Sequence, residues 1–435
     1  MTPAPRARSA RAWSLAAALA AVAAAASPGC RRDIHLLPDL SFDGGGDTGL
    51  GRVDGAVDRA RVDAAPACVG LGPPITLPTA NGLTCAAALA TRGHHFAVCT
   101  CNLENPSPLP LETLGARLRT YAFDSTNSSY GDDKVSAAVG IDGALTTSAD
   151  LEVEGAIYVA GGFVTANGHL QAGASFRSAG PLTMQSSEQA DLQGDAYING
   201  YVSGSVNVSG TLYVPTTFDV GEDVQAKAIY PGPVSVSAPC DCSNGFVNVG
   251  SAIDQASMNN GDAAAGFDQD ALAAVSSATQ LTLGCGTYYL SAIGSATGAT
   301  PPITLVVHGH ALLAVGGDVI INGGLNVMLD PSAELDLLVG QWLITKGGTI
   351  GAPSAPARFR IWVASTDTLA FDGQPTIAAV VHAPFSQAIV SSGLTLSGSL
   401  FVDSLTLLAD SEVHYDKAIL SVGAECGEPV ASPPP

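Results

Sequence analysis

A short pattern that recurs along the chain at a nearly constant interval constrains the fold more than any other feature of the sequence. Each copy alternates apolar and variable residues up to a glycine, then continues with a small or apolar residue, an aromatic residue and an apolar residue. The copies occupy residues 151–159, 169–176, 190–198, 206–214 and, far downstream, 394–402. Their glycines stand at positions 155, 173, 194, 210 and 398. A period of roughly 20 residues, built from short alternating strands, is typical of a β-solenoid.

We therefore expect an all-β fold, a β-solenoid of the right-handed parallel β-helix type. Alternation with a period of two places one apolar set on one face of each strand, and rungs stacked about 4.8 Å apart bury that set continuously. The glycine is expected where the chain turns a corner without room for a Cβ atom. The recurring aromatic residues are expected to fill the core or a corner, with a stacked ligand-binding ladder as the alternative; they are Tyr158, Phe176, Tyr197, Tyr213 and Phe401.

The composition agrees with an all-β chain and argues against nucleic acid as a partner. Only 13% of the 435 residues are charged, 49 are glycine, and the formal net charge is −21. Lysine occurs only at positions 134, 227, 346 and 417. Nucleic acid and anionic lipid headgroups both require a basic patch, which this composition does not favour. The acidity is expected to keep the chain soluble, with attraction of cations such as Ca²⁺ as the alternative.

Residues 1–30 have the pattern of a lipoprotein-type export signal. Three arginines precede an apolar run over residues 13–26, which is too short to cross a membrane as a helix. The run ends at Cys30, and the residues before it resemble the lipobox of bacterial lipoproteins, in which the cysteine becomes the lipidated first residue. Two lipobox positions depart from the usual pattern, so cleavage by an ordinary signal peptidase is the alternative. We expect Cys30 to anchor the protein in the cell envelope, at the outer membrane because Arg31 follows it.

The region after the signal is expected to be a tether followed by a small cap. Residues 31–66 are rich in Asp and Gly and predict a disordered acidic linker. Residues 67–131 predict a cysteine-containing N-terminal cap, with a Thr-capped helix over residues 84–92. His94 and His95 follow this helix and are expected to form a solvated turn.

Eight further cysteines predict disulfides. An even number of cysteines in an exported chain is typical of a disulfide framework, and eight allow 105 pairings. Two Cys-x-Cys units make a metal site the alternative, but zinc sites usually separate the paired cysteines by two to four residues. We expect disulfides and no metal or cofactor; the candidates are Cys68, Cys85, Cys99, Cys101, Cys240, Cys242, Cys285 and Cys426.

The strand pattern divides the rest of the chain into two solenoid blocks. The first block is expected over residues 132–231 and the second over residues 303–422. Residues 232–302 break the period and predict a cysteine-containing helical insertion that covers one face or joins the blocks. A short helical or irregular cap is expected to cover the unpaired edge of the last rung. Residues 423–435 form a Pro-rich tail.

Four polar residues form a candidate surface site. His308 and His310 lie on one side of a predicted strand and resemble part of the Gly-His-Gly motif of pectin-degrading β-helix hydrolases, whose Arg-Ile-Lys unit is missing here. Glu334 and Asp336 share a strand face about 6–7 Å apart, a separation at which paired carboxylates hydrolyse glycosides. Exposed histidines and an ordinary polar strand face are the alternatives that we favour, so we assign no catalytic residue.

Three short motifs in the second half of the chain carry a family resemblance. They are a Cys-Asp-Cys unit at Cys240, a Cys-Gly-Thr-Tyr-Tyr-Leu strand at Cys285, and a closing His-Tyr-Asp-Lys-Ala motif that begins at His414. With them, residues 235–422 resemble an uncharacterised exported β-solenoid domain of bacterial lipoproteins and of PilX-like pilus-assembly proteins. The first block is similar in pattern to polymer-forming β-helices of the bactofilin type. Neither resemblance implies catalytic residues.

These expectations favour a non-enzymatic lipoprotein of the cell envelope with a structural, adhesive or assembly role. Its expected partners are the membrane, through the lipid anchor at Cys30, and either further copies of itself or an envelope polysaccharide. A carbohydrate-active β-helix enzyme, either a hydrolase or a lyase, is one alternative. A glycan-binding module is another, and it would require exposed Tyr or Trp side chains along one face, with Trp342 and Trp362 as the residues to inspect.

Overall fold

The chain folds as an all-β solenoid, which confirms the predicted fold class. The computed structural model describes residues 70–103, 110–126, 137–185, 188–242, 247–266, 268–294, 300–422 and 426. All strands from β3 to β33 belong to one hydrogen-bonded system in which every pairing is parallel. Each strand pairs with the strand that occupies the same position one rung above or below. The rungs therefore bury a continuous core and satisfy one another's backbone groups.

The strands form three faces, here called A, B and C. Four long strands turn corners and contribute to more than one face: β17 (Ser205–Val214), β18 (Val224–Pro231), β31 (Thr376–Val390) and β32 (Leu394–Leu407). Face A also contains β5 (Leu118–Phe123), β8 (Leu151–Val153), β11 (Leu170–Ala172), β14 (Gln189–Leu192), β19 (Thr279–Leu283), β22 (Ile303–Val307), β25 (Leu325–Leu329), β28 (Thr349–Gly351) and β33 (Ser411–Asp416).

Faces B and C complete each rung. Face B contains β3 (Val98–Thr100), β6 (Val139–Ile141), β9 (Ile157–Val159), β12 (Phe176–Ser178), β15 (Ala196–Ile198), β20 (Gly286–Leu290), β23 (His310–Val315), β26 (Glu334–Val339) and β29 (Phe359–Val363). Face C contains β4 (Leu111–Thr113), β7 (Leu145–Thr147), β10 (Val164–Ala166), β13 (Leu182–Met184), β16 (Val202–Ser203), β21 (Ile293–Gly294), β24 (Val319–Ile321), β27 (Leu343–Lys346) and β30 (Leu369–Asp372).

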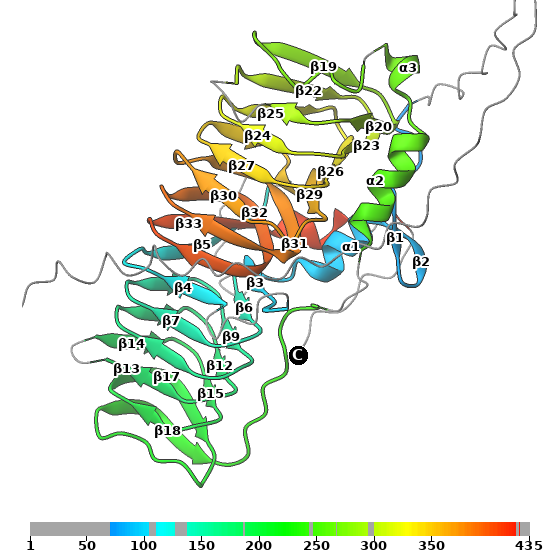
Figure 1. The fold of residues 1–435 in the computed structure, drawn as a ribbon. Coiled ribbons are helices and arrows are strands. Elements are labelled where there is room, and N and C mark those ends of the chain that lie inside the picture. The colour runs from blue at the N-terminus through cyan, green and yellow to red at the C-terminus, as the bar shows by residue number, and fades with distance from the viewer. Residues whose placement is uncertain are drawn as a thin grey trace, which may run out of the picture. The chain divides into compact units, whose positions relative to one another are not determined.

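The order of the rungs differs from the order of the chain (Figure 1). The stack begins at β19, descends through the second block to β33, continues into β5 and then through the first block to β18. The first strands of the solenoid, β3, β4 and β5, thus lie in the middle of the stack and pair with β32 and β33. We expected residues 67–131 to cap one end. The structure instead makes this region the junction between the two blocks.

The same pairing corrects two further expectations. The edge of β33 is not unpaired, because β5 lies beside it along residues 411–416. The short 3-10 helix η2 (Lys417–Leu420) follows β33 as expected, but it covers no free edge. The second block also begins earlier than residue 303, since β19, β20 and β21 already form a complete rung before it.

The in-facing side chains build the core column by column. On face A, Leu118, Leu151 and Leu170 lie directly above one another and are at most 1% exposed. Their outward neighbours in sequence are polar, as the period of two predicts. Full burial of each leucine stabilises the fold by about 1.5–3 kcal/mol, so every added rung extends a core that no single rung could form.

Corner glycines are required by close approach between rungs. A Cβ atom on Gly173 would overlap the carbonyl oxygen of Glu154 in the next rung. Gly398 has a φ of +137°, and a Cβ atom there would overlap the carbonyl oxygen of Ala379. The expected role of the repeating glycine therefore has a specific cause, which is backbone contact with the neighbouring rung.

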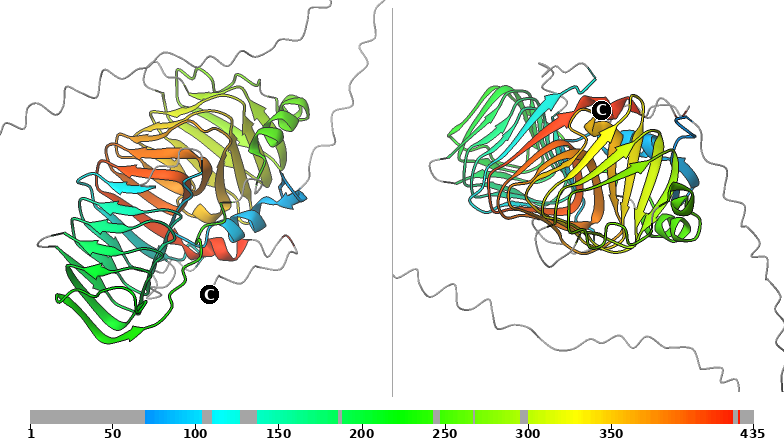
Figure 2. Two further views of the ribbon diagram at one scale, coloured as in Figure 1. Left: turned by 60° about the horizontal axis from the view of Figure 1, so that its bottom comes forward. Right: turned by 90° about the horizontal axis from the view of Figure 1, so that it is seen from above.

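A hairpin and two helices cover part of the outer side of face B (Figure 2). A hairpin of β1 (Thr76–Thr79) and β2 (Gly82–Cys85) leads into helix α1 (Ala86–Gly93). Helix α2 (Val249–Met258) packs on β20, β23 and β26. Thr84 does not cap α1 as expected. It pairs with Leu77 in the hairpin, so Cys85 takes the cap position and the helix begins at Ala86.

The segment that follows β18 returns along the outside of the stack. Tyr230 and Cys240 lie five rungs apart, about 24 Å at the usual spacing, because Cys240 bonds to Cys99 beside Gly140. The chain between these two residues must therefore be largely extended. The chain then forms α2 and the short α3 (Asp262–Ala265). The segment between α3 and β19 covers β20 and β21. A further 3-10 helix, η1 (Pro356–Arg358), precedes β29.

Candidate functional site

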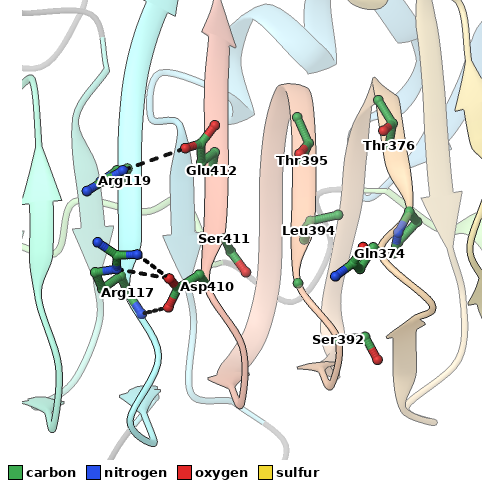
Figure 3. A pocket seen from close by; sticks show the side chains of 12 residues that line it. Arg117, Arg119, Gln374, Thr376, Ser392, Leu394, Thr395, Asp410, Ser411 and Glu412 are labelled. Atoms are coloured by element: carbon green, nitrogen blue, oxygen red, sulfur yellow. Dashed lines mark hydrogen bonds and ion pairs between the residues drawn. The ribbon is translucent and has the colours of Figure 1, made fainter.

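A shallow polar groove lies on face A, where β31, β32, β33 and β5 adjoin (Figure 3). It encloses about 400 Å³ and is open to solvent. Hydroxyl and amide groups line one half of it, from Gln374, Thr376, Ser392 and Thr395. Charged side chains line the other half. The lining is therefore suited to a ligand rich in hydroxyl groups rather than to an apolar one.

Ion-paired side chains line the second half of the groove. The Arg117 guanidinium donates to Asp410 at 2.9 Å from Nε, and the Arg117 backbone N–H donates to the same carboxylate at 2.9 Å. These hydrogen bonds lower the pKa of Asp410. Arg119 lies between Glu152 at 3.1 Å and Glu412 at 3.9 Å. Each cation of the groove is therefore matched by a carboxylate.

A constrained turn forms the rim of the groove. Gln374 has a φ of 58°, a conformation that glycine or asparagine adopts more readily. The preceding Asp372 accepts hydrogen bonds from Ser392 Oγ, the Gly373 backbone N–H and Ser391 Oγ, which lower the pKa of its carboxyl. Backbone strain in a non-glycine residue often marks a functional position. Gln374 is thus a residue with a strained backbone whose side chain lines the groove.

The predicted carboxylate pair is locked in an ion cluster. Glu334 and Asp336 lie on the outer side of face B, at 7% and 0% exposure. Arg360, from the next strand, donates to both; its Nε and Nη2 are 2.8 and 2.7 Å from Asp336. Trp362 Nε1 also donates to Asp336 at 2.7 Å. Two carboxylates that share one buried guanidinium cannot act as general acid and general base on a glycoside.

The two predicted histidines are separated by their environments. His308 is exposed and its Nδ1 lies 2.7 Å from Asp330. His310 is 7% exposed, pairs in register with Glu334, and its Nδ1 lies 3.2 Å from the carbonyl oxygen of Gly72. Of the four candidate residues, the structure thus brings His310, Glu334 and Asp336 onto one buried face. None of the four lines the groove.

A single column of side chains runs along the outer side of face B, and its lower half is a partly exposed ladder. This ladder contains Tyr158, Arg177, Tyr197, Tyr213 and Tyr230 in successive rungs. The Arg177 guanidinium lies 5.5 Å from the ring of Tyr158 and 5.0 Å from that of Tyr197. The rings of Tyr197 and Tyr213 are 4.5 Å apart and nearly parallel. The rings of Tyr197 and Tyr213 are thereby largely covered by their neighbours, whereas Tyr230, at the end of the ladder, is 60% exposed.

This column corrects the expected role of the aromatic residues. Three of the five predicted residues, Tyr158, Tyr197 and Tyr213, point outward instead of filling the core. Phe176 is fully buried, and Arg177 takes its place in the column. Phe401 belongs to the upper, covered half of the same column and stacks on His382 with centroids 4.7 Å apart.

The buried histidines of the upper column were not anticipated. His94 is 1% exposed rather than solvated, because α1 carries it onto face B, where its Nδ1 lies 2.9 Å from Ser399 Oγ. His382 is 2% exposed between the rings of Trp362 and Phe401. Burial lowers the pKa of His382 to about 3. Burial, followed by the charges of His382 and His95, also holds the pKa of His94 well below its ordinary value.

The tryptophans and the closing motif have structural surroundings. Trp362 is fully buried, while Trp342 is 46% exposed outside the groove. Tyr415 and Asp416 of the closing motif are both fully buried. The Asp416 carboxylate accepts from Ser125 Oγ at 2.7 Å and from three backbone N–H groups. Burial nevertheless raises the pKa of Asp416.

Every cysteine that the structure describes is disulfide-bonded. Cys99 bonds to Cys240 and Cys101 to Cys242, which pins the returning segment to β3 and the residues after it. Cys85 bonds to Cys426 and ties α1 to the end of the chain. Cys285 is also bonded. Cys30 and Cys68 lie outside the described residues. Among those same residues, no helix is both long and apolar enough to cross a membrane.

Comparison with known proteins adds one match. A family model described as "Domain of unknown function (DUF7305)" matches residues 240–422, which is less than half of the chain. The matched span begins at the first cysteine of the Cys-Asp-Cys unit and ends just after η2. No curated protein and no solved structure matches the chain.

Proposed function

We propose that this chain is a non-enzymatic lipoprotein of the bacterial cell envelope, with a structural and adhesive role built on a rigid β-solenoid. In this proposal Cys30 carries the lipid, residues 31–66 space the solenoid from the outer membrane, and the outer faces meet other envelope components. The observation that carries the proposal is that all described cysteines are in disulfides. Disulfides persist in oxidising compartments outside the cytosol.

The chemistry of the polar clusters supports a role without catalysis. The carboxylates best placed for glycoside chemistry, Glu334 and Asp336, are both bonded to Arg360 and buried. The charged groups of the groove are likewise paired with each other. A continuous core, with disulfides that tie distant parts of the chain together, is what a load-resisting scaffold requires.

Fractionation of cells tests the anchor. The wild-type chain and a Cys30→Ala variant are expressed in a Gram-negative host, with Ser27→Ala as a control that alters the signal but keeps the cysteine. We expect the wild type and the control in the outer-membrane fraction, and Cys30→Ala in the soluble fraction. Retention of Cys30→Ala in the membrane would contradict the anchor.

Recognition of a neutral envelope polysaccharide by the groove is a second candidate function. It is favoured by the hydroxyl and amide lining and by the balanced charges described above. In the described part of the groove no aromatic side chain lines the surface, so we expect weak binding that gains strength from many anchored copies.

Binding assays with neutral and uronic-acid oligosaccharides test this second function. Thr376→Val and Thr395→Val remove two hydroxyls from the groove without changing shape or charge. Thr304→Val is the matched control, since Thr304 lies on the same outer side of face A, away from the groove. We expect the paired groove variants to weaken binding of the neutral sugars at least tenfold and the control to bind normally. Equal binding by all variants would remove the groove from consideration.

A further inference from the structure

Face C of the first block presents an uncharged outer surface, bounded by Glu112 in the rung before it and Asp219 in the rung after it. Its strands β7, β10 and β13 have three residues each, and only the middle side chain of each points outward. The residues at the two corners of the face add one column on either side. The three columns carry only hydroxyl, amide and apolar side chains; they are Phe163, Pro181 and Tyr201, then Thr146, Thr165, Thr183 and Ser203, then Ser148, Asn167 and Gln185.

The lack of charge on this surface contrasts with the rest of the chain. The formal net charge is −21, and on the same rungs the outer side of face A carries Glu152 and Asp191. A charged ligand would find no group of opposite sign on this side of face C. A neutral ligand rich in hydroxyl groups can exchange hydrogen bonds with the threonines, which both donate and accept. Charge therefore favours a neutral polysaccharide here.

Two exposed aromatic side chains border this surface. Phe163 is 39% exposed and Tyr201 is 47% exposed. They share one column at the corner between faces B and C, because the Val164 N–H donates to the carbonyl of Pro181 and the Leu182 N–H donates to that of Tyr201. Pro181 occupies the rung between them. The two aromatic residues are therefore two rungs apart, about 9.6 Å at the usual spacing.

Each residue of this corner column directly follows a glycine, which fixes the spacing. A Cβ atom on Gly180 would overlap the carbonyl oxygen of Gly162 in the neighbouring rung. A Cβ atom on Gly200 would likewise overlap the backbone of Pro181. The rungs thus touch backbone to backbone at this corner, so the side chains that follow the glycines are held one rung apart.

We infer that this side of face C binds an extended, uncharged, β-1,4-linked polysaccharide whose chain runs along the stack. In such a chain each sugar is turned over relative to the one before it, so every second sugar presents the same face, at an interval close to two rungs. The apolar C–H faces of two such sugars cover Phe163 and Tyr201, because C–H groups pack favourably on the face of an aromatic ring. The sugar hydroxyls then lie beside Thr165 and Thr183.

The shape of the apolar part favours a sugar chain over a protein partner. The strip from Phe163 to Tyr201 is one residue wide and gives way at once to hydroxyl groups on face C. A protein interface needs a broader apolar centre that excludes water. A single aromatic side chain, in contrast, is enough to cover one face of one sugar ring.

Isothermal titration calorimetry tests the inference on the full chain carrying Cys30→Ala, so that the result does not depend on the lipid anchor. The probes are cellohexaose, which is neutral and extended, and maltohexaose, which is neutral and curved. We expect cellohexaose to bind at least tenfold more tightly than maltohexaose. Phe163→Ala combined with Tyr201→Ala should weaken binding of cellohexaose at least tenfold. Trp342→Ala is the control, because Trp342 is similarly exposed, at 46%, but lies in the second block.

Two further pairs of substitutions separate this surface from the groove on face A and from effects on folding. Phe163→Tyr with Tyr201→Phe keeps both rings and should bind normally. Thr376→Val with Thr395→Val should also bind normally; the inference shares only its class of ligand with the second candidate function, so either can fail alone. The inference is overturned if the unsubstituted surface binds neither sugar or binds both equally, if the alanine pair binds normally, or if only the groove pair or Trp342→Ala weakens binding.

Discussion

The Tyr415 hydroxyl donates a 2.8 Å hydrogen bond to the backbone carbonyl of His94, a residue 321 positions earlier in the chain. Tyr415 lies on β33, the last strand in chain order. His94 directly follows helix α1, which lies near the start of the described chain. Thr91 of α1 makes a similar bond to the carbonyl of Ile419 at 3.1 Å. The two ends of the described fold are therefore fastened to each other in the middle of the stack.

Removal of this bond should weaken the junction measurably. Tyr415→Phe leaves the buried carbonyl of His94 without the tyrosine donor, so we expect a loss of about 1–3 kcal/mol in the free energy of unfolding. Tyr121→Phe is the control, because Tyr121 lies on the neighbouring strand with its ring partly exposed. Urea unfolding followed by circular dichroism provides the measurement, and equal midpoints for both variants would contradict the prediction.

The sequence predicted the local part of this architecture and missed the non-local part. Short alternating strands and corner glycines are visible along the chain, since each depends on residues within one rung. The placement of β3, β4 and β5 between the two blocks depends on β32 and β33, which come from the opposite end of the described chain. No spacing in the sequence records such a pairing. The burial of His94 was missed for the same reason.

One error has a more local cause. In the copy that ends at Phe176, the Gly173 N–H donates to the carbonyl oxygen of Val153, and the Ala174 N–H donates to that of Gly155. Gly173 is thus level with Glu154 rather than with Gly155. Both corners have three residues, residues 173–175 and 154–156, but the glycine comes first in one and second in the other. A count from the glycine is therefore shifted by one residue, so Phe176 turns inward and Arg177 enters the outer column. A motif measured from its glycine cannot reveal this shift, because the pairing of the rungs decides it.

The ion cluster on face B should be required for stability and not for any reaction. Arg360→Met leaves Glu334 and Asp336 buried without their shared cation, so we expect a loss of about 3–5 kcal/mol. Adding Glu334→Gln and Asp336→Asn to that variant removes the unpaired charges and should recover much of the loss. Chemical denaturation of the three proteins measures both steps. No recovery in the triple variant would mean that the packing of Arg360, not its charge, stabilises this face.

Either of the two neighbouring disulfides should provide most of their joint stabilisation when the other is absent. Cys99–Cys240 and Cys101–Cys242 each close a loop of 141 residues, but either one alone already closes it. Loss of one bond through paired Ala substitutions should therefore cost about 2 kcal/mol, and loss of the second about 5 kcal/mol more. Thermal unfolding of the two single-bond variants and of the variant without either bond gives the comparison. Equal steps would refute the shared-loop explanation.

The buried histidines should make the fold sensitive to acid. His382 has a pKa of about 3 in the fold and about 6.5 when unfolded. The unfolded chain therefore binds the proton more readily, and stability falls as the pH drops from about 6.5 toward 3. At pH 4.5 this residue should lower stability by roughly 3 kcal/mol relative to neutral pH. His94, whose pKa is also lowered, adds in the same direction.

A variant isolates this contribution from opposing groups. Burial raises the pKa of Asp142 to about 6, so its effect on stability runs in the opposite direction over part of the range. The informative quantity is the difference in unfolding free energy between His382→Leu and the wild type, measured from neutral pH to pH 4.5. We expect this difference to shift by roughly 3 kcal/mol in favour of the variant. His308→Gln, at an exposed site, should show no comparable shift.

The position of β5 in the middle of the stack sets an order in which the molecule can be completed. During synthesis the rungs from β5 to β18 can assemble as soon as residue 231 has emerged, and both disulfides to β3 and its neighbour can form by residue 242. The other edge of β5 has no strand to pair with until β33 arrives, after the whole second block has been made. Until then the half-built protein exposes two open sheet edges, and only the last strand closes the one at the junction.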